Sequence, residues 1–385
     1  MHQTLDQKKP HVVLAACFDL SKAFNRVDHI LVIQDLYDMK TPAWLLNIVA
    51  SYLTNRTMTL TYDGAVSVLK NLPAGTPQGA FLVGLIFIIK FNGAFLRPPI
   101  PRPGPLNNSS AEKVKYIDDG TVAVSVNLKS ALLIDPVDRP RPVNFSERSG
   151  HILPSQNNLL QYYVKDTENF ASDNNMKINK KKTHLIKFSN ARKLDFPAEV
   201  HFSDGSFLET VQHTTLLGVV VSNDLKWKKN TEYICNKARQ KLWILRRMIK
   251  LNLSELELFD VYQKEIRSIL EFAAPVWHSS LTRRQTSEIE SVQKFAFKII
   301  LGKAHTSYDS ACAKFETDTL EQRRLKLCLR FAMKNINSNN SLFIKPNENF
   351  NLRRKNNLVQ EYKCNKAKFQ RSSFPFLAKL ANSNS

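Results

Sequence analysis

The run VKYIDDGTVAV at residues 114–124 sets two adjacent carboxylates, Asp118 and Asp119, in the middle of an otherwise apolar, strand-like stretch. An Asp-Gly pair flanked by alternating apolar residues predicts a β-hairpin whose turn lies at Asp119-Gly120. A second interpretation is a metal site. Adjacent residues in a regular strand point to opposite faces, so the two carboxylates converge only where the chain turns, and Gly120 permits a turn. The local sequence leaves both interpretations open.

A second apolar run, His11–Phe18, predicts a buried central strand because almost every side chain in it is apolar. Asp19 follows directly at the carboxyl end of this strand. The later segments predict, in order, helices from Asp28 and Thr41, a hairpin at 58–69, a helix from Thr76 toward Phe95, the hairpin at 114–124, a helix around 159–170, strands near Leu185, a hairpin at Asp204-Gly205 and a strand at 216–221.

From about residue 230 to residue 336 the pattern is wholly helical. Ser254 followed by Glu257 predicts a capping box within this region. The last stretch is basic and rich in Asn and Ser, which predicts a poorly ordered tail. The expected fold class is therefore α+β, with helices packed on an antiparallel sheet over 1–229, an all-α domain over 230–336 and the tail over 337–385.

The chain of 385 residues carries 55 Lys and Arg against 34 Asp and Glu, a formal net charge of +21. Such a surplus favours a polyanionic partner, nucleic acid first and an anionic membrane second. Charge alone leaves open a basic protein that has no such partner. The longest apolar stretch, Phe81–Ile89, is about half the length that a membrane span needs, so no membrane partner is expected.

Cysteine usage bears on the compartment. The five cysteines have no CxxC spacing and no histidines at zinc spacing: Cys17, Cys235, Cys312, Cys328 and Cys364. This usage indicates a reducing compartment and argues against a zinc knuckle or a disulfide framework. Because the first residues are polar, no signal peptide is visible. We expect an intracellular protein, with the nucleus and the cytoplasm equally compatible.

Three short segments occur in a telling order: FDLSKAF at 18–24, GTPQGA at 75–80 and YIDD at 116–119. Together they resemble the palm of a reverse transcriptase of the kind encoded by non-LTR, LINE-like retrotransposons. Each segment alone is a weak signal, whereas the ordered set is highly specific. The resemblance covers roughly residues 11–230, and it continues as a general similarity to a thumb-like region as far as about 336.

The resemblance implies a function and its metal ligands. The reaction would be RNA-templated attack of a primer 3′-OH on the α-phosphate of a dNTP, so the partners would be an RNA template, a DNA primer or target, and dNTPs. No protein partner is implied. Asp19, Asp118 and Asp119 would hold two divalent ions, with Asp118 the principal ligand of the adjacent pair. Carboxylate oxygens suit Mg²⁺, and Mn²⁺ is a possible substitute.

The resemblance also implies residues that contact the incoming nucleotide. Phe24 would be the steric gate that excludes a ribose 2′-OH, which favours dNTPs over the substrates of an RNA-dependent RNA polymerase. Gln78 would contact the nucleotide, and Gly79 would leave room for its close approach. Alternatives stay open at each position. Taken alone, Phe24 is better interpreted as a core residue after a strand, and the Gly-Thr-Pro-Gln-Gly segment can also be a helix-entry turn.

Two further elements extend the match, NKKKT at 179–183 and LLGVVVSNDLKW at 216–227. In the first, Lys182 resembles the lysine proposed to protonate the pyrophosphate leaving group, although most lysines in such a charge run are simply solvated. In the second, Leu217 and Gly218 resemble the primer-grip hairpin. The basic and aromatic run KLWILRRMIK suits a thumb helix that follows a nucleic-acid backbone, or an amphipathic helix with a solvated basic face.

The match departs from the family at the N-terminus. The chain starts just before the Asp19 strand, whereas the family places much of its fingers and an endonuclease domain upstream. We therefore expect a truncated or domesticated copy with its three carboxylates intact. The rival hypothesis is a catalytically silent, nucleic-acid-binding remnant. Primer extension with an Asp118→Asn control discriminates the two.

Overall fold

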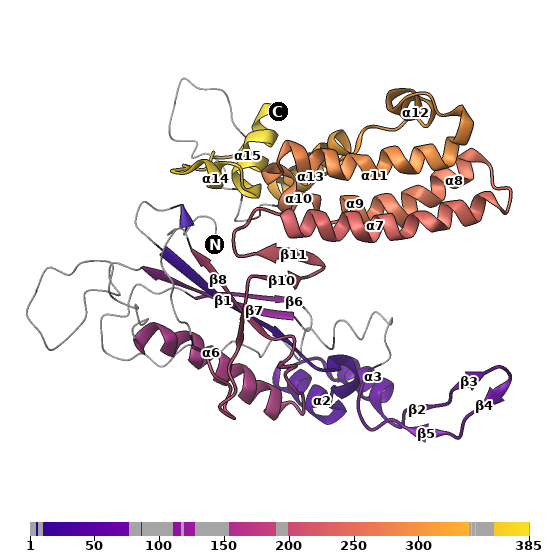
Figure 1. Ribbon diagram of the computed structural model, residues 1–385. Coiled ribbons are helices and arrows are strands. Elements are labelled where there is room, and N and C mark those ends of the chain that lie inside the picture. The colour runs from indigo at the N-terminus through magenta and orange to yellow at the C-terminus, as the bar shows by residue number, and fades with distance from the viewer. Residues whose placement is uncertain are drawn as a thin grey trace, which may run out of the picture. The chain divides into compact units, whose positions relative to one another are not determined.

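The computed structural model describes residues 5–6, 11–76, 86, 111–116, 119–127, 154–189, 199–338, 340, 343 and 358–384. The chain divides into two compact units (Figure 1). The first unit spans Lys9–Gln212, and the second combines His2–Lys8 with His213–Ser385.

The first unit mixes strands and helices. Its described elements are β1 (His11–Asp19), the 3₁₀ helix η1 (Ala23–Arg26), α2 (His29–Asp38), α3 (Ala43–Leu53), β2 (Thr57–Met58), β3 (Thr61–Tyr62), β4 (Ala65–Val66), β5 (Lys70–Asn71), β6 (Ala111–Tyr116), β7 (Asp119–Asn127), α6 (Pro154–Asp173), β8 (His184–Ser189) and β9 (Glu209–Val211).

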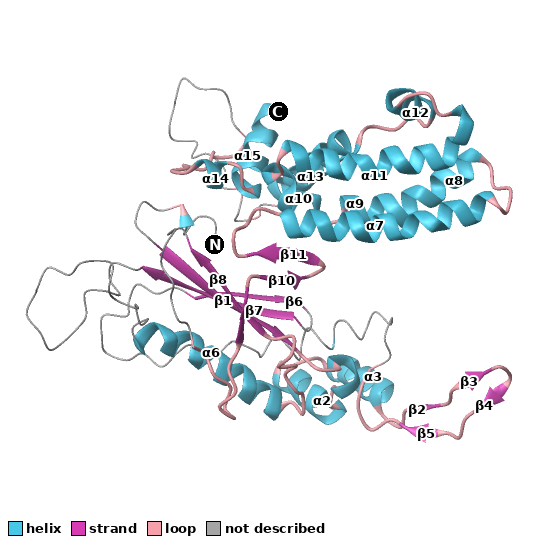
Figure 2. Ribbon diagram, viewed as in Figure 1, coloured by secondary structure: helices cyan, strands magenta, loops and turns pink. Residues whose placement is uncertain are grey.

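Five of these strands form one sheet in the order β6-β7-β1-β8-β9 (Figure 2). The pairs are antiparallel except for β8 with β9, which are parallel. β1 is the central strand: it has a partner strand on each edge, and its apolar side chains from Val12 to Phe18 are buried on both faces of the sheet. The expected central strand and the α+β class with an antiparallel sheet are confirmed.

The expected turn at Asp119-Gly120 is wrong. Both residues belong to β7, where Asp119 pairs with Tyr116 of β6 and Gly120 pairs with Lys115. On its other edge β7 continues the ladder against β1, so that Gly120 also opposes Phe18. Ladder partners on both edges outweigh the local turn preference of an Asp-Gly pair. The connection between β6 and β7 is Ile117-Asp118, which lies outside the described residues.

Helix α6 covers the sheet and closes the core of this unit. Its buried residues Leu160, Tyr163 and Val164 share one apolar cluster with Leu14 and Phe18 of β1. This is the amphipathic face predicted for residues 159–170. Successive side chains of β1 point to opposite faces of the sheet, so the even-numbered residues of the strand belong to this cluster.

A hairpin follows α3, as predicted. Asp63 and Gly64 form its tip, and both have positive φ (48° and 77°), which is the type I′ combination that matches strand twist. The predicted N-cap of α2 is also present, because the Asp28 carboxylate accepts hydrogen bonds from the N–H groups of Ile30 and Leu31. The predicted helix from Thr76 toward Phe95 and the proline-rich stretches lie largely or wholly outside the described residues.

The second unit is helical apart from one hairpin. Its described elements are β10 (His213–Leu216), β11 (Val219–Ser222), α7 (Lys228–Ile249), α8 (Glu255–Tyr262), the π-helix η2 (Gln263–Arg267), α9 (Ser268–Glu271), α10 (Ala274–Trp277), the 3₁₀ helix η3 (His278–Ser280), α11 (Arg283–Leu301), the 3₁₀ helix η4 (Gly302–Ala304), α12 (Tyr308–Lys314), α13 (Leu320–Asn337), α14 (Ala367–Gln370) and α15 (Ser373–Ser383).

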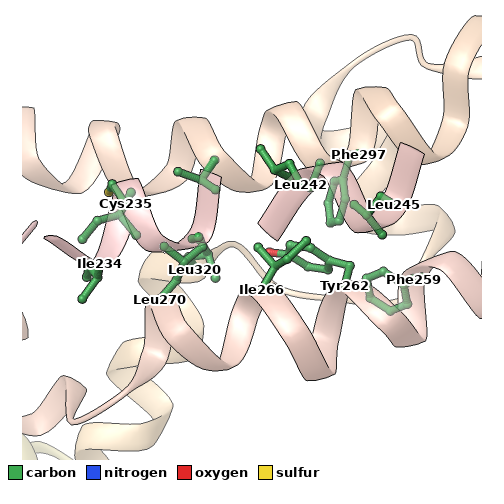
Figure 3. Packing of buried hydrophobic residues seen from close by; sticks show 14 of the residues in the cluster. Ile234, Cys235, Leu242, Leu245, Phe259, Tyr262, Ile266, Leu270, Phe297 and Leu320 are labelled. Atoms are coloured by element: carbon green, nitrogen blue, oxygen red, sulfur yellow. The ribbon is translucent and has the colours of Figure 1, made fainter. Parts of the chain in front are cut away.

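Aromatic packing holds the helical core together (Figure 3). Phe259 stacks on Phe315 with ring centroids 4.4 Å apart, and Phe297 lies edge-on to Tyr262 at 5.6 Å. The Tyr262 hydroxyl is buried, and it donates a hydrogen bond of 2.6 Å to Gln293 Oε1. The predicted capping box of Ser254 and Glu257 begins α8. No helix among the described residues is long and apolar enough to cross a membrane.

The second unit begins earlier than the helical pattern of the sequence, at His213 instead of residue 230. The reason is that hairpin β10–β11 packs with the helices: Val219 and Trp227 lie in the helical core. The Asn230 side chain of α7 also accepts a hydrogen bond from the Val220 N–H, at 3.1 Å. A strand pattern therefore predicts the element but not the unit to which it belongs.

The expected poorly ordered tail is contradicted over residues 358–384, which contain α14 and α15. Leu377, Ala378 and Ala381 of α15 are buried in a cluster with Cys328 and Ala332 of α13. Three apolar residues on one face of a short helix suffice for this packing, and the surrounding Asn and Ser residues mask the pattern in the sequence.

His278 makes the helical unit sensitive to acid. Its Nδ1 is buried and has no hydrogen-bond partner among the described residues. Burial, assisted by the charge of Arg324, lowers the pKa of His278 from 6.5 to about 4. The ring of Phe376 in α15 packs edge-on against it at 6.1 Å. The folded protein therefore binds fewer protons than the unfolded chain between pH 4 and pH 6.5.

We expect the free energy of unfolding to fall as pH is lowered from 6.5 to 4, with His278 contributing up to roughly 3 kcal/mol of the loss. Stability from this residue is complete above pH 6.5, the unfolded value. Urea denaturation at a series of pH values measures the slope. In His278→Gln this part of the pH dependence should disappear, and an unchanged slope would contradict the account.

Candidate active site

Two of the predicted carboxylates are register partners in the sheet. Asp19 ends β1 and Asp119 begins β7, and these two residues oppose each other in the antiparallel ladder. Asp118 is the residue before Asp119 and lies outside the described residues. The structure thus brings Asp19 to the strand end that carries the Asp-Asp pair.

The backbone of Asp19 is held on both sides by the NKKKT element. Asn179 N–H donates to the Asp19 carbonyl at 2.8 Å, and the Asp19 N–H donates to the Thr183 hydroxyl at 3.3 Å. The same hydroxyl donates to the Asn179 carbonyl at 3.0 Å. Sequence reasoning missed this role of Asn179 and Thr183. The signal was present, because both residues belong to the quoted element.

Lys182 lies in the same turn but takes no part in this clamp through its side chain. Its backbone N–H donates to the Asn179 carbonyl at 3.0 Å, and its side chain is exposed. The fold therefore brings the element to Asp19 by backbone contacts. A catalytic role for the Lys182 ammonium stays a prediction.

The segment after Asp19 packs against the start of the glycine-bracketed turn. Thr76 N–H donates to the Phe24 carbonyl at 2.9 Å, and Gly75 N–H donates to the Val27 carbonyl at 2.8 Å. The His29 ring Nε2 donates to the Gly75 carbonyl at 2.7 Å. These three bonds join the first and second motifs of the sequence in one place.

Gly75 is required for this contact. Its φ is +89°, and a Cβ there would lie 3.0 Å from the Asn25 carbonyl oxygen. The Phe24 side chain is half-buried and packs against the sheet core. This position suits both readings of Phe24, a core residue and a gate at the edge of the core. Gln78 and Gly79 follow Thr76 in the chain but lie outside the described residues.

Leu217 and Gly218 form the tip of hairpin β10–β11 in the second unit. Both have positive φ, 48° and 78°, so the tip is a type I′ turn. The expected hairpin is therefore present at the predicted residues. Its role as a primer grip stays a prediction.

The donor set at the end of β1 and β7 suits a hard divalent cation. Carboxylates supply oxygen ligands, which Mg²⁺ prefers over nitrogen and sulfur. The hydrogen bonds that join Asp19 to the NKKKT element use its backbone N–H and carbonyl, not its carboxylate. Among the described residues no group of three acidic, histidine or cysteine side chains forms a metal cluster.

The hydroxyl of Thr183 is expected to matter for stability. The side chain is fully buried, and it accepts from Asp19 while donating to Asn179. Thr183→Val keeps the shape but leaves a buried N–H without a partner, so we expect a loss of about 1–3 kcal/mol in the free energy of unfolding. Thr183→Ser keeps the hydroxyl and should lose less. Urea denaturation decides, and equal losses in both variants would refute the clamp.

Comparison with known proteins identifies the family. Residues 1–234 match the model of the reverse transcriptase (RNA-dependent DNA polymerase) family. An RNA-directed DNA polymerase from the mobile element jockey of Drosophila funebris is 24% identical over 246 residues, which is 62% of this chain and 23% of that protein. A probable RNA-directed DNA polymerase from transposon X-element of Drosophila melanogaster is 22% identical over 317 residues, 81% of this chain and 30% of that protein.

Solved structures give a looser similarity. Telomerase from Candida tropicalis, in complex with a telomeric RNA fragment, overlaps 98% of this chain and 47% of its own at 11% identity and a TM-score of 0.36. Telomerase from Candida albicans overlaps 86% of this chain and 49% of its own at 11% identity and a TM-score of 0.30. Overlaps at these TM-scores carry no argument about function.

The chain spans about a quarter to a third of the length of the curated relatives described above. These relatives come from mobile elements, as the resemblance of the motifs implied. The family match covers well over half of the chain and includes both register-paired carboxylates. The protein belongs to the reverse transcriptase (RNA-dependent DNA polymerase) family.

Proposed function

We propose that this protein is an RNA-directed DNA polymerase of a non-LTR retrotransposon. The observation that carries the proposal is the register of the sheet, in which Asp19 at the end of β1 opposes Asp119 at the start of β7. A carboxylate from each of two neighbouring strands, with Asp118 beside the second, is the arrangement that a pair of divalent ions needs. The family match and the mobile-element relatives support the same reaction.

Two Mg²⁺ ions are the proposed cofactors, held by Asp19, Asp118 and Asp119. When bound about 3.5–4 Å apart, such ions activate the primer 3′-OH and stabilise the charge on the triphosphate. The role of the protein in this step is to hold the metal-ligating residues rigidly. Clamping of the Asp19 backbone by Asn179 and Thr183 serves that purpose, because the strand end has no freedom to move away.

The proposed substrates are dNTPs. Phe24 lies next to the Asp19 strand and is hydrogen-bonded through its carbonyl to Thr76, two residues before Gln78. A bulky ring at this point would collide with a ribose 2′-OH, while Gln78 and Gly79 would contact the nucleotide. Lys182, exposed in the turn that clamps Asp19, is proposed to give a proton to the departing pyrophosphate as the new P–O bond forms.

The proposed template and primer are RNA and DNA, and the second unit offers a surface for them. Helix α7 has seven basic residues and one acidic residue. Lys237 and Arg247 are exposed on it, and Trp243 is 59% exposed. Basic groups contribute phosphate contacts of any sequence, and an exposed indole offers a stacking face for a base.

Primer extension tests the proposal. The full chain is incubated with a DNA primer annealed to an RNA template, dNTPs and Mg²⁺, and with Asp118→Asn in parallel. The proposal expects extension by the parent, little with rNTPs and none by the variant. Binding of the primer–template without extension would overturn the proposal and support a silent, nucleic-acid-binding remnant. Equal use of rNTPs would overturn the role of Phe24.

A further inference from the structure

An aromatic residue far along the chain contacts the β10–β11 tip. A Cβ built on Gly218 would lie 3.1 Å from Cε1 and 3.5 Å from Cζ of Phe272, so one edge of this ring rests against the glycine. The remainder is open, because Phe272 is 53% exposed. Leu217, the other residue of the tip, is 46% exposed. Leu217 of the tip and the aromatic ring that contacts the tip are therefore both about half-exposed.

Phe272 is presented by an irregular stretch of backbone. The π-helix η2 precedes α9, and Ala273 has a left-handed conformation with φ +51°. π-Helical turns and non-glycine residues at positive φ are uncommon, and they gather at functional sites. The Trp277 indole donates to the Phe272 carbonyl at 3.0 Å, which fixes the bend between α9 and α10.

The bend is anchored on both sides. Leu270 and Trp277 are almost fully buried, so the exposed ring stands between two fixed points. Arg323 makes two hydrogen bonds to the Glu271 carboxylate, and Arg267 lies 3.9 Å from the same group. These contacts anchor the backbone on the N-terminal side of Phe272. Helix α7 of the same unit carries seven basic residues and one acidic residue, so the unit suits a phosphate-bearing ligand better than an apolar one.

A ring that only covered Gly218 would need no exposed face and no anchored bend. Because the Phe272 ring is held in place with one face exposed, it can stack on a base without losing side-chain entropy on binding. We propose that Phe272 stacks on the 3′-terminal base of the primer strand, with the Leu217-Gly218 tip against the adjoining sugar. This inference rests on the function proposed above and extends its primer site by a residue outside every motif of the sequence.

Photo-crosslinking tests the contact without any catalysis. The full chain binds an RNA template whose DNA primer ends in 5-iodouracil, a base that crosslinks to stacked aromatic side chains, and peptide mapping locates the adduct. The expected adduct is on Phe272. A primer with 5-iodouracil several nucleotides upstream is the control for position, and it should give no adduct there. An adduct of the terminal base on another residue would overturn the inference.

Kinetics of variants test the role. Phe272→Leu keeps apolar packing against Gly218 but has no ring, so we expect the KM for primer–template to rise about tenfold while the KM for dNTP is unchanged. Phe272→Trp should retain both the adduct and the KM. Phe331→Ala, an exposed aromatic residue on α13, is the matched control and should behave as the parent. Thermal unfolding verifies that each variant is folded.

The outcomes separate this inference from the proposed function. An adduct on Phe272 in a chain that does not extend primers supports the inference about binding and refutes the polymerase. Extension without an adduct on Phe272, or Phe272→Leu with the KM values of the parent, supports the polymerase and refutes the inference.

Discussion

Asp19→Asn is expected to reduce primer extension by about a thousandfold or more, while binding of the primer–template stays near that of the parent. The backbone N–H and carbonyl of Asp19 are held by neighbouring residues, Thr183 and Asn179. An amide cannot replace the negative charge that a divalent ion requires. Metal ions supply several kcal/mol of transition-state stabilisation, and each 1.36 kcal/mol is a factor of ten in rate.

The matched control is Asp63→Asn. Asp63 lies at the tip of the exposed hairpin with φ 48°, a conformation that Asn tolerates as well as Asp. Single-turnover extension at saturating primer–template measures the rates. The control should retain the rate of the parent. A rate for Asp19→Asn within tenfold of the control would show that Asp19 is not a metal ligand.

Glu290→Ala is expected to lower the free energy of unfolding by about 3–5 kcal/mol. The Glu290 carboxylate accepts hydrogen bonds from the N–H groups of Leu320 and Glu321, at 3.2 and 2.6 Å, at the start of α13. It also accepts from the Tyr308 hydroxyl at 2.6 Å. Its remaining neighbour is Arg324, 3.9 Å away and fully buried. Removal of Glu290 would therefore leave a buried cation without its counter-charge.

Glu288→Ala is the control for this loss, because Glu288 is on the same helix and its pairing with Arg239, at 4.0 Å, is partly exposed. Such surface pairs contribute about 0–1 kcal/mol. Arg324→Met gives the contrast, since all three guanidinium nitrogens lack a hydrogen-bond partner among the described residues. We expect a smaller loss than in Glu290→Ala, because the Glu290 carboxylate keeps its three hydrogen bonds. Urea denaturation measures all three, and a loss in Arg324→Met as large as in Glu290→Ala would contradict this reading.

The elements that the sequence predicted well are those whose pattern is local. The apolar run of β1, the Asp63-Gly64 turn and the Ser254 capping box each follow from a few neighbouring residues. The Asp119-Gly120 pair has an equally strong local pattern, yet it lies within a strand. Pairing with β1, about 100 residues away, decides its conformation. No window of the sequence contains that information.

Some residues of the site were likewise predictable from a local pattern, and others were not. The residue types of Asp19 and Asp119 pointed to metal ligands, and the register shows that the fold sets them opposite each other. The clamp by Thr183 was not foreseen, although Thr183 belongs to the NKKKT element, because the element does not show which distant residue its hydroxyl contacts. The role of Phe272 could not be predicted from the sequence for a further reason. Its contact with Gly218 depends on the bend at Ala273, two residues before Pro275. The proline predicts a helix break but not the distant residue that the bend brings Phe272 against.

The central claim is that Asp19 and the Asp118-Asp119 pair hold the same metal ions. Replacement of Mg²⁺ by Fe²⁺, followed by ascorbate and peroxide, generates hydroxyl radicals that cut the backbone next to the bound ion. The account predicts cuts near residue 19 and near residues 118–119 together, both suppressed by excess Mg²⁺ and both lost in Asp19→Asn. Cuts near only one of these two segments, or cuts that persist in Asp19→Asn, would contradict it.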